Sequence, residues 1–241
     1  MTAPLQLLPT RSGSAAENMA LDFLLLQRFP EPEIARFRHY GWHGPAFTFG
    51  YSQKIAAIRA SLPPGESFDL CRRPTGGGLV DHRDDWTYSL VIPRGHALEE
   101  QPAPHSYRLI HEALAEALRA QGVSAVVKSA PDEDAAGPAG VCFERAEKSD
   151  VVRSSDGAKI AGAAQKRNKH GLLFQGSIWR PATGTAMDWD KFHDDFTAEL
   201  ARVLGVVAAP APWPDLNEDE VTGLTERYAS PEWLDLIKFK N

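Results

Sequence analysis

The sequence predicts an α/β (α+β) fold in which a mixed, largely antiparallel sheet is flanked by helices. Short apolar runs typical of strands alternate along the chain with segments of helical periodicity. Three of the strand-like runs, at 150–153, 158–166 and 171–179, follow one another across short turns, as in an antiparallel meander. The composition agrees with a folded domain, because 43% of the 241 residues are hydrophobic and can form a substantial core.

The first third of the chain predicts one helix among several strands. Residues 5–9 are typical of a short strand. A helix is expected over 14–29, because Ser14 is a favourable N-cap and Glu17, three residues later, completes a capping box. Breaks rich in Gly and Pro separate the apolar runs that follow. We expect strands in these runs at 34–40, 47–51, 68–71 and 86–92.

The remainder of the chain predicts three longer helices. One is expected over 104–121, where apolar residues recur at helical spacing. Two more are expected at 188–204 and 216–228, and a strand at 123–127. Neither a repeat nor a convincing linker divides the sequence. We therefore expect a single domain over 1–241, without a separate C-terminal accessory domain.

Charge, hydropathy and cysteine count limit the class of protein. A net charge of −6 argues against general nucleic-acid binding, because phosphates require a basic face. The sequence has no apolar run of membrane-spanning length and begins without the features of a signal peptide, so we expect a cytoplasmic protein with no membrane partner. Cys71 and Cys142 lack the spacing of a zinc site or a disulfide framework. We expect them to be free thiols and expect no metal site.

The most unusual stretch is Arg-Arg-Pro-Thr-Gly-Gly-Gly-Leu-Val-Asp-His at 72–82. Three consecutive glycines lose much conformational entropy on ordering and have no side chains to pack, so they are unfavourable inside a strand or helix. They follow one expected strand and precede another, which places them at a strand end where backbone N–H groups can approach a ligand beside two arginines. A flexible hairpin turn is the alternative interpretation.

Four motifs, taken together and in this order, resemble the lipoate-protein ligase and octanoyltransferase family. They are residues 72–82, Thr87-Tyr88-Ser89, Val141-Cys142-Phe143 and residues 159–167. The likeness extends to residues 17–22 and 42–51 and so spans roughly residues 10 to 180. It implies a fold related to biotin protein ligases and class II aminoacyl-tRNA synthetases. A biotin ligase itself is disfavoured, because the Gly-Arg-Gly-Arg-type stretch of those enzymes is replaced here by residues 72–78.

The resemblance implies transfer of an octanoyl or lipoyl group to a lysine of a lipoyl carrier domain, with octanoyl-acyl carrier protein as the octanoyl donor. Lys159 would reach the reacting carbonyl, and Cys142 would form a thioester, since a nearby ammonium lowers the pKa of a thiol. Lys159 as an exposed turn lysine, and Cys142 as a small core residue, are the alternatives. The substrate-binding residues carried over are Arg72, Gly76, Gly77, Gly78, His82, Asp150, Gly162 and Gln165.

Two chemistries remain open at such a pocket. A cysteine-dependent octanoyltransferase needs no cofactor, whereas a lipoate-protein ligase uses ATP and Mg²⁺ to make an acyl-adenylate, which Arg72, the glycines and Lys159 would hold. Cys142 favours the transferase. A third alternative is a non-catalytic protein that binds lipoyl domains or acyl carriers. It is motivated by Gln175, which stands where the family usually has a histidine. Ala163 is a second departure, in a run that usually reads Gly-Ser-Ala-Gln.

Overall fold

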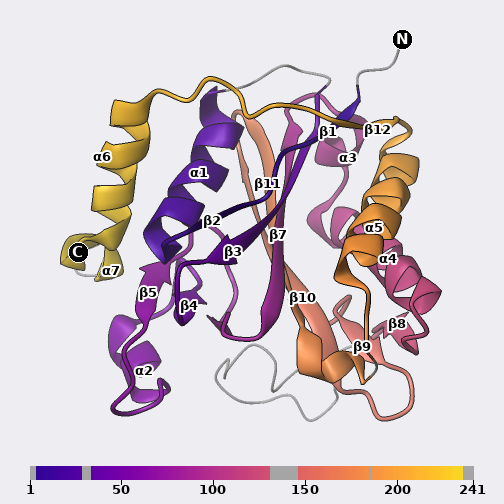
Figure 1. Ribbon diagram of the computed structural model, residues 1–241, viewed down its shortest axis with the longest axis horizontal. Helices are drawn as coiled ribbons and strands as arrows, with labels where there is room; N and C mark the ends of the chain where they lie inside the picture. Colours follow the sequence, from indigo (N-terminus) through magenta and orange to yellow (C-terminus); the bar gives the residue numbers. More distant parts are fainter. Residues whose placement is uncertain (1–3, 29–33, 131–145, 185, 236–241) are drawn as a thin grey trace.

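The computed structural model describes residues 4–28, 34–130, 146–184 and 186–235, and its centre is a large mixed sheet (Figure 1). Within these residues the strand order is β12-β1-β3-β7-β11-β10-β9-β8, with β2 paired to β3. All pairs from β3 to β8 along this order are antiparallel, and only the pairs made by β1 and β2 are parallel. The strands are β1 (Leu5–Leu7), β2 (Arg11–Gly13), β3 (Arg36–Trp42), β7 (Asp85–Pro93), β8 (Ala125–Val127), β9 (Val151–Arg153), β10 (Lys159–Asn168), β11 (Gly171–Trp179) and β12 (Ala208–Pro210).

The predicted fold class is therefore confirmed, and so is the meander. Strands β9, β10 and β11 are joined by short turns and pair antiparallel, as the sequence indicates. The strands that the sequence predicts best are those whose partners are adjacent in the chain, because their pairing depends on local turns.

A smaller sheet holds the triglycine stretch. It consists of β5 (Asp69–Arg72), β4 (Ala46–Phe49) and β6 (Leu79–Asp81), in that order, with the short helix α2 (Ile55–Ala60) beside it. The glycines connect β5 to β6. The sequence predicts a strand end before the glycines, which is confirmed. It misses β6, whose three residues are too few for a recognisable alternation, and takes β7 of the large sheet as the next strand.

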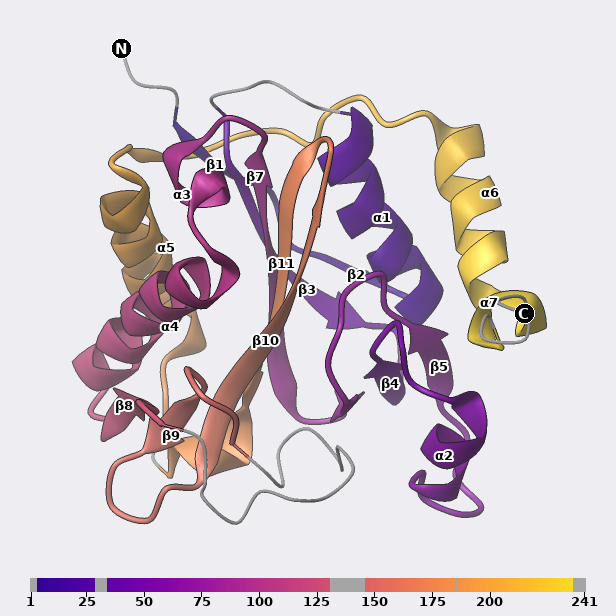
Figure 2. The ribbon, with the colours of Figure 1, turned by 180° about the vertical axis from the view of Figure 1, so that it is seen from behind.

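Helices cover both faces of the large sheet. Helix α1 (Ala15–Arg28) lies on one face with α6 (Glu218–Ala229) outside it, and α4 (Ala103–Ala120) and α5 (Trp189–Leu204) lie on the other (Figures 1 and 2). Helix α1 begins with the expected capping box, in which the Glu17 N–H donates to Ser14 Oγ over 3.1 Å and the Ser14 N–H donates to the Glu17 carboxylate. Shorter helical segments are α3 (Ala97–Glu100), a 3₁₀ turn (Arg180–Thr183) and α7 (Pro231–Leu234).

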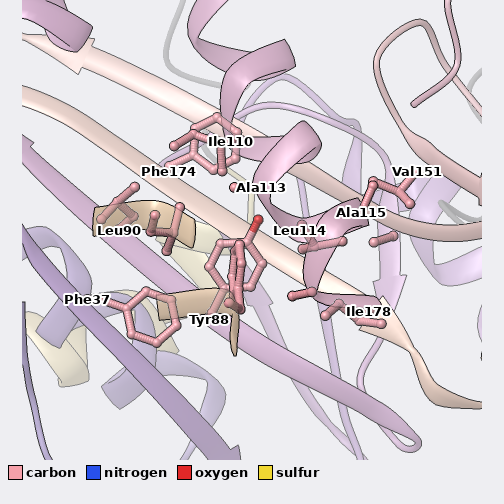
Figure 3. Packing of buried hydrophobic residues seen from close by; sticks show 14 of the residues in the cluster. Phe37, Tyr88, Leu90, Ile110, Ala113, Leu114, Ala115, Val151, Phe174 and Ile178 are labelled. Carbon is pink, nitrogen blue, oxygen red and sulfur yellow. The ribbon is translucent and has the colours of Figure 1, made fainter. Parts of the chain in front are cut away.

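The main hydrophobic core lies between the sheet and the α4–α5 layer (Figure 3). Leu114 of α4 and Phe196 of α5 are fully buried there against Phe37, Tyr88 and Phe174 of three neighbouring strands. Successive residues of a strand point to opposite faces of the sheet. The residues next to Phe37, Tyr88 and Phe174 in their strands therefore face α1. Among the described residues, no helix is both long and apolar enough to cross a membrane.

Candidate active site

A cavity opens between the triglycine loop, helix α1 and the parts of β10 and β11 at residues 162–164 and 175–177. It encloses about 460 Å³, part of which is open to solvent. Its lining is mostly apolar with a few polar side chains, which suits a ligand with a hydrocarbon body and a polar end. The lining residues are Met19, Tyr40, Thr48, Arg73, Gly77, Val80, His82, Thr87, Gly162, Ala163, Ala164, Gln175, Gly176 and Ser177.

The triglycine loop is held in shape by Arg73. Its guanidinium donates to the carbonyls of Gly76 and Gly78 over 2.8 and 3.0 Å, and also to the carbonyl and hydroxyl of Thr48. Gly77 lies between them with φ at +91°, a backbone conformation that side chains with a Cβ rarely adopt. The loop thus requires glycine at this position and an arginine behind it.

The two adjacent arginines have different surroundings. Arg72 does not line the cavity, although the resemblance places it at the acyl or phosphate site. It is buried, and its guanidinium donates to backbone carbonyls of Tyr51, Gln53 and Trp233, which tie β5 to α7. Arg73 is the arginine that lines the cavity, and the sequence analysis does not select it. Successive residues along a strand face opposite sides of the sheet. An error of one position in the expected facing therefore exchanges the arginine that lines the cavity with the arginine that ties β5 to α7.

His82 lines the polar side of the cavity, where it is bonded at both ring nitrogens. Nδ1 lies 2.7 Å from Asp85 Oδ2 and Nε2 lies 2.7 Å from Thr48 Oγ1, while Trp42 packs over the ring at 4.1 Å. A carboxylate accepts hydrogen bonds, so Nδ1 carries a proton. His82 is only 7% exposed, so it is not a surface histidine.

Asp85 is the buried anion of this site. Burial alone would raise the pKa of its carboxyl group, but the charge of His82 and the hydrogen bond from His82 lower it below its ordinary value. Hydroxyl groups of Ser177 and Thr87 donate to the same oxygen and act in the same direction. Asp85 is thus ionised and orients His82.

Lys159 and Asp150 form a buried ion pair beside the cavity. Their Nζ and Oδ2 atoms are 2.7 Å apart, and their side chains are 4% and 6% exposed. A Cβ at Gly162, which lines the cavity, would lie 2.9 Å from Lys159 Nζ and 3.1 Å from Asp150 Oδ1. The amine therefore occupies the space that a side chain at Gly162 would fill, and Lys159 is not an exposed turn lysine.

Gln175 connects the loop to helix α1. Its Oε1 accepts a hydrogen bond from Thr75 Oγ1 at 2.7 Å, and its Nε2 donates to Asp22 Oδ2 at 2.7 Å. Asp22 is fully buried, accepts a hydrogen bond from Ser89 and forms a buried ion pair with Arg38. Both ends of the Gln175 amide thus have partners, so this residue, which stands in place of the family's histidine, ties the loop to helix α1.

Three further residues complete the inventory. Gln165 does not line the cavity, because its amide bonds to the Ala103 carbonyl and to Ser106 on helix α4. Cys142, the predicted nucleophile, lies outside the described residues. Cys71 is fully buried, and burial raises the pKa of its thiol far above the ordinary value, so Cys71 is an unreactive core residue as the sequence suggests.

Comparison with known proteins decides the family. The family model described as lipoyl protein ligase A/B catalytic domain matches residues 14–189, which is more than half of the chain. The chain belongs to this family. The resemblance drawn from the four motifs is therefore confirmed.

Among curated relatives, an octanoyltransferase LipM of Anoxybacillus flavithermus is 36% identical over 172 residues, which are 68% of this chain and 61% of that protein. One from Bacillus cereus is 34% identical over 197 residues, 79% of this chain and 68% of that protein. The match thus spans about two thirds or less of these relatives. An octanoyltransferase LipM of Symbiobacterium thermophilum is 28% identical, over 95% of this chain and 97% of that protein.

Solved structures share the fold of this family member. A lipoate-protein ligase A bound with ATP has a TM-score of 0.72 at 18% identity, covering 96% of this chain and 98% of that one. The protein Ta0514 from T. acidophilum, a putative lipoate protein ligase with bound lipoic acid, has a TM-score of 0.72 at 19% identity and covers the same fractions. At these identities the likeness concerns the fold alone.

Proposed function

We propose that this protein is an acyltransferase that moves an octanoyl group, or a lipoyl group, onto a lysine of a lipoyl carrier domain in protein lipoylation. One observation carries the proposal: a mostly apolar cavity borders a buried amine, Lys159, held by Asp150. The relatives named octanoyltransferase support the choice of reaction. The donor would be octanoyl-acyl carrier protein, and the reaction would take place in the cytoplasm.

The acyl chain would lie against the apolar wall of the cavity. Met19, Val80 and Ala164 contribute to that wall. Each methylene group removed from water contributes about 0.8 kcal/mol, so a medium-length chain gains several kcal/mol on binding. The polar wall, with His82 and Thr48, would receive the carboxyl end.

The reaction would have two steps. The Cys142 thiolate attacks the donor thioester, a new thioester forms on Cys142, and the carrier thiol leaves with a proton. The lysine amine of the lipoyl domain then attacks this thioester, which forms the amide and returns the thiol of Cys142. Lys159 would hold the carbonyl and pass protons between the incoming and leaving groups.

The triglycine loop would stabilise the oxyanion of each step. Its carbonyls are already engaged, those of Gly76 and Gly78 by Arg73 and that of Gly77 by the Gln53 amide. Carbonyl oxygens only accept hydrogen bonds, so we assign the developing negative charge to the N–H groups of the loop. A donor of this kind typically contributes about 3 kcal/mol to catalysis.

Intact-mass spectrometry tests the proposal. Incubated with octanoyl-acyl carrier protein and no ATP, the protein should gain one octanoyl group, and the Cys142→Ala variant should gain none. Cys71→Ala is the matched control, because it removes the only other cysteine, and it should acylate like the unmodified protein. Adding a lipoyl domain should move the mass from the enzyme to the domain.

Two rival functions predict different masses. A lipoate-protein ligase would modify the lipoyl domain only with free lipoate, ATP and Mg²⁺, and Cys142→Ala would retain its rate. The neighbouring ligase structures motivate this rival. No three His, Cys, Asp or Glu side chains of the described residues gather to hold a metal ion, but nucleotide-bound Mg²⁺ takes most ligands from phosphate and water, so the donor set fits either function. A non-catalytic binding protein would bind carriers tightly and leave every mass unchanged.

A further inference from the structure

The backbone just before Asp150 is strained. Ser149 has φ at +73°, the positive φ of a left-handed conformation, and it is the one such residue other than glycine in the part of the chain described by the structure. A residue with a Cβ adopts this conformation only where its surroundings enforce it, and such strain gathers at functional positions. Something must hold Ser149 in place.

The histidine that holds it comes from helix α4. His111 is fully buried, and its Nδ1 makes a very short hydrogen bond to the Ser149 carbonyl. A carbonyl only accepts, so Nδ1 carries the proton and donates. Nε2 has no hydrogen-bond partner among the described residues, and the rings of Tyr107 and Phe174 pack edge-on against the imidazole at 5.2 and 5.9 Å.

The imidazole is neutral in this environment. Burial lowers the pKa of His111, with nearby Lys159 acting in the same direction and Asp150 and the hydrogen bond to Ser149 opposing it. The neutral histidine has a single N–H, at Nδ1, and donates it to the Ser149 carbonyl. A residue retained only for packing would not need this polar ring, whose second nitrogen is left without a partner.

The turn held by His111 delivers Asp150 to Lys159. The Asp150 N–H donates to the Glu147 carbonyl at 3.1 Å, and Asp150 Oδ2 accepts from the Glu147 N–H at 2.7 Å. The same oxygen lies 2.7 Å from Lys159 Nζ. The Asp150 carbonyl accepts from the Lys128 N–H at 2.8 Å, which fixes the other side of the turn. These bonds hold the Asp150 carboxylate next to the Lys159 amine, directly after the residue whose carbonyl His111 holds.

We propose that His111 is a positioning residue, which holds the Ser149 turn so that Asp150 keeps Lys159 charged and aimed at the cavity. The inference rests on the proposed function only in giving Lys159 a role in acyl transfer. The placement itself depends on contacts between α4, the turn and β10. Asp150 pairs with Lys159, and His111 lies near enough for the charge of Lys159 to lower its pKa.

The test measures the pH dependence of labelling at Lys159 in the full-length protein. A small amine-reactive anhydride modifies neutral amines, and mass spectrometry of peptides gives the pH midpoint for Lys159. In His111→Leu the donor to Ser149 is absent, so Asp150 should leave the amine and the midpoint should fall by at least roughly 0.5 pH unit, because an adjacent carboxylate favours the charged amine. His111→Asn places an amide N–H near the position of Nδ1 and should restore the midpoint.

Two further variants keep the test decisive. His111→Gln places its amide nearer the position of Nε2, so it keeps a polar group but lacks the donor to Ser149. Its midpoint should fall as expected for His111→Leu. This variant decides the question if the leucine variant folds poorly. Ser149→Gly relieves the strain but keeps the carbonyl, so it should leave the midpoint unchanged. An unchanged midpoint in both His111→Leu and His111→Gln would overturn the proposal.

Acyl transfer provides a second readout that separates this proposal from the proposed function. With octanoyl-acyl carrier protein and a lipoyl domain, His111→Leu should lower kcat about tenfold with KM unchanged, and His111→Asn should recover most of the rate. If the unmodified protein transfers no acyl group, the proposed function fails, while the labelling midpoints still decide the role of His111.

Discussion

The two faces of the central sheet are built by the same strands but differ in chemistry. In β11, Phe174 and Ile178 point into the apolar core under α4 and α5, whereas Gln175 and Ser177 point toward α1 and line the cavity. The alternation follows from the two-residue period of a strand. The difference teaches that one face specifies the fold, whereas the other carries a buried polar site beside the cavity.

The polar face is not uniform. Toward the end of the sheet near Leu8, its residues Val91 and Leu173 pack against Leu25 and Leu26 of α1 in a second apolar cluster. Polar residues begin only where α1 approaches the triglycine loop. The site thus occupies one end of an otherwise ordinary helix–sheet contact, and it can be altered without disturbing the main core.

The largest expected effect is a loss of stability caused by a substitution on the apolar face. Phe174→Ala removes a fully buried ring between the sheet and α4 and should lower the free energy of unfolding by about 4 kcal/mol, measured by urea denaturation. Val126→Ala, at a side chain that is 40% exposed, is the control and should change stability little. A loss below about 1 kcal/mol for Phe174→Ala would show that this face does not dominate stability.

A smaller effect concerns a histidine on the α5 face. His39 stacks on Trp86 at 4.2 Å and bonds to the Thr87 carbonyl through Nδ1. Burial, helped by the charges of His193 and Arg180, lowers the pKa of His39 from 6.5 to about 4. Between these values the unfolded chain binds a proton that the folded protein does not, so stability falls as pH drops from 6.5 to 4, by about 2–3 kcal/mol.

The variant His39→Asn isolates this contribution. Asparagine keeps an N–H donor for the Thr87 carbonyl but does not titrate, so its unfolding free energy should depend less on pH between 4 and 6.5 than that of the unmodified protein. The other histidines are present in both proteins and cancel in the comparison. Equal pH slopes would mean that His39 is not held neutral by burial.

The smallest expected effect is on the activation free energy of acyl transfer and leaves the stability of the fold nearly unchanged. In Gly162→Ala, the new methyl group takes the space of the Lys159 amine, whose flexible end can move aside. We expect stability to change little and acyl transfer to fall about tenfold, equivalent to about 1.4 kcal/mol. Gly223→Ala in α6, where a Cβ meets nothing within 4 Å, is the matched control and should keep the full rate.

The sequence predicts most of what local interactions determine. Ser14 and Glu17 mark the start of α1 because a capping box involves only neighbouring residues. The meander of β9, β10 and β11 follows from its short turns. The sequence comes close to placing Lys159 next to Asp150 in the same way, since Asp150 directly precedes β9 and Lys159 begins β10.

The features that the sequence does not predict depend on contacts between residues distant in the chain, or on the exact residue at which a strand ends. Arg73 rather than Arg72 lines the cavity because of the position at which β5 ends, and a difference of one residue reverses the two. Gln175 bonds to Asp22 across 153 residues, a pairing that no local pattern indicates. Ser149, whose φ is positive, likewise bonds to His111 of α4, 38 residues away in the chain, a contact that no local pattern indicates.

The central claim is that the cavity on the α1 face receives the acyl chain. The most direct measurement is a crystal structure of the protein after reaction with octanoyl-acyl carrier protein. The account predicts a hydrocarbon chain between the triglycine loop and α1, in contact with Met19 and Val80. A chain seated instead on the opposite face, in the cleft lined by His39, Trp189 and His193, would contradict it.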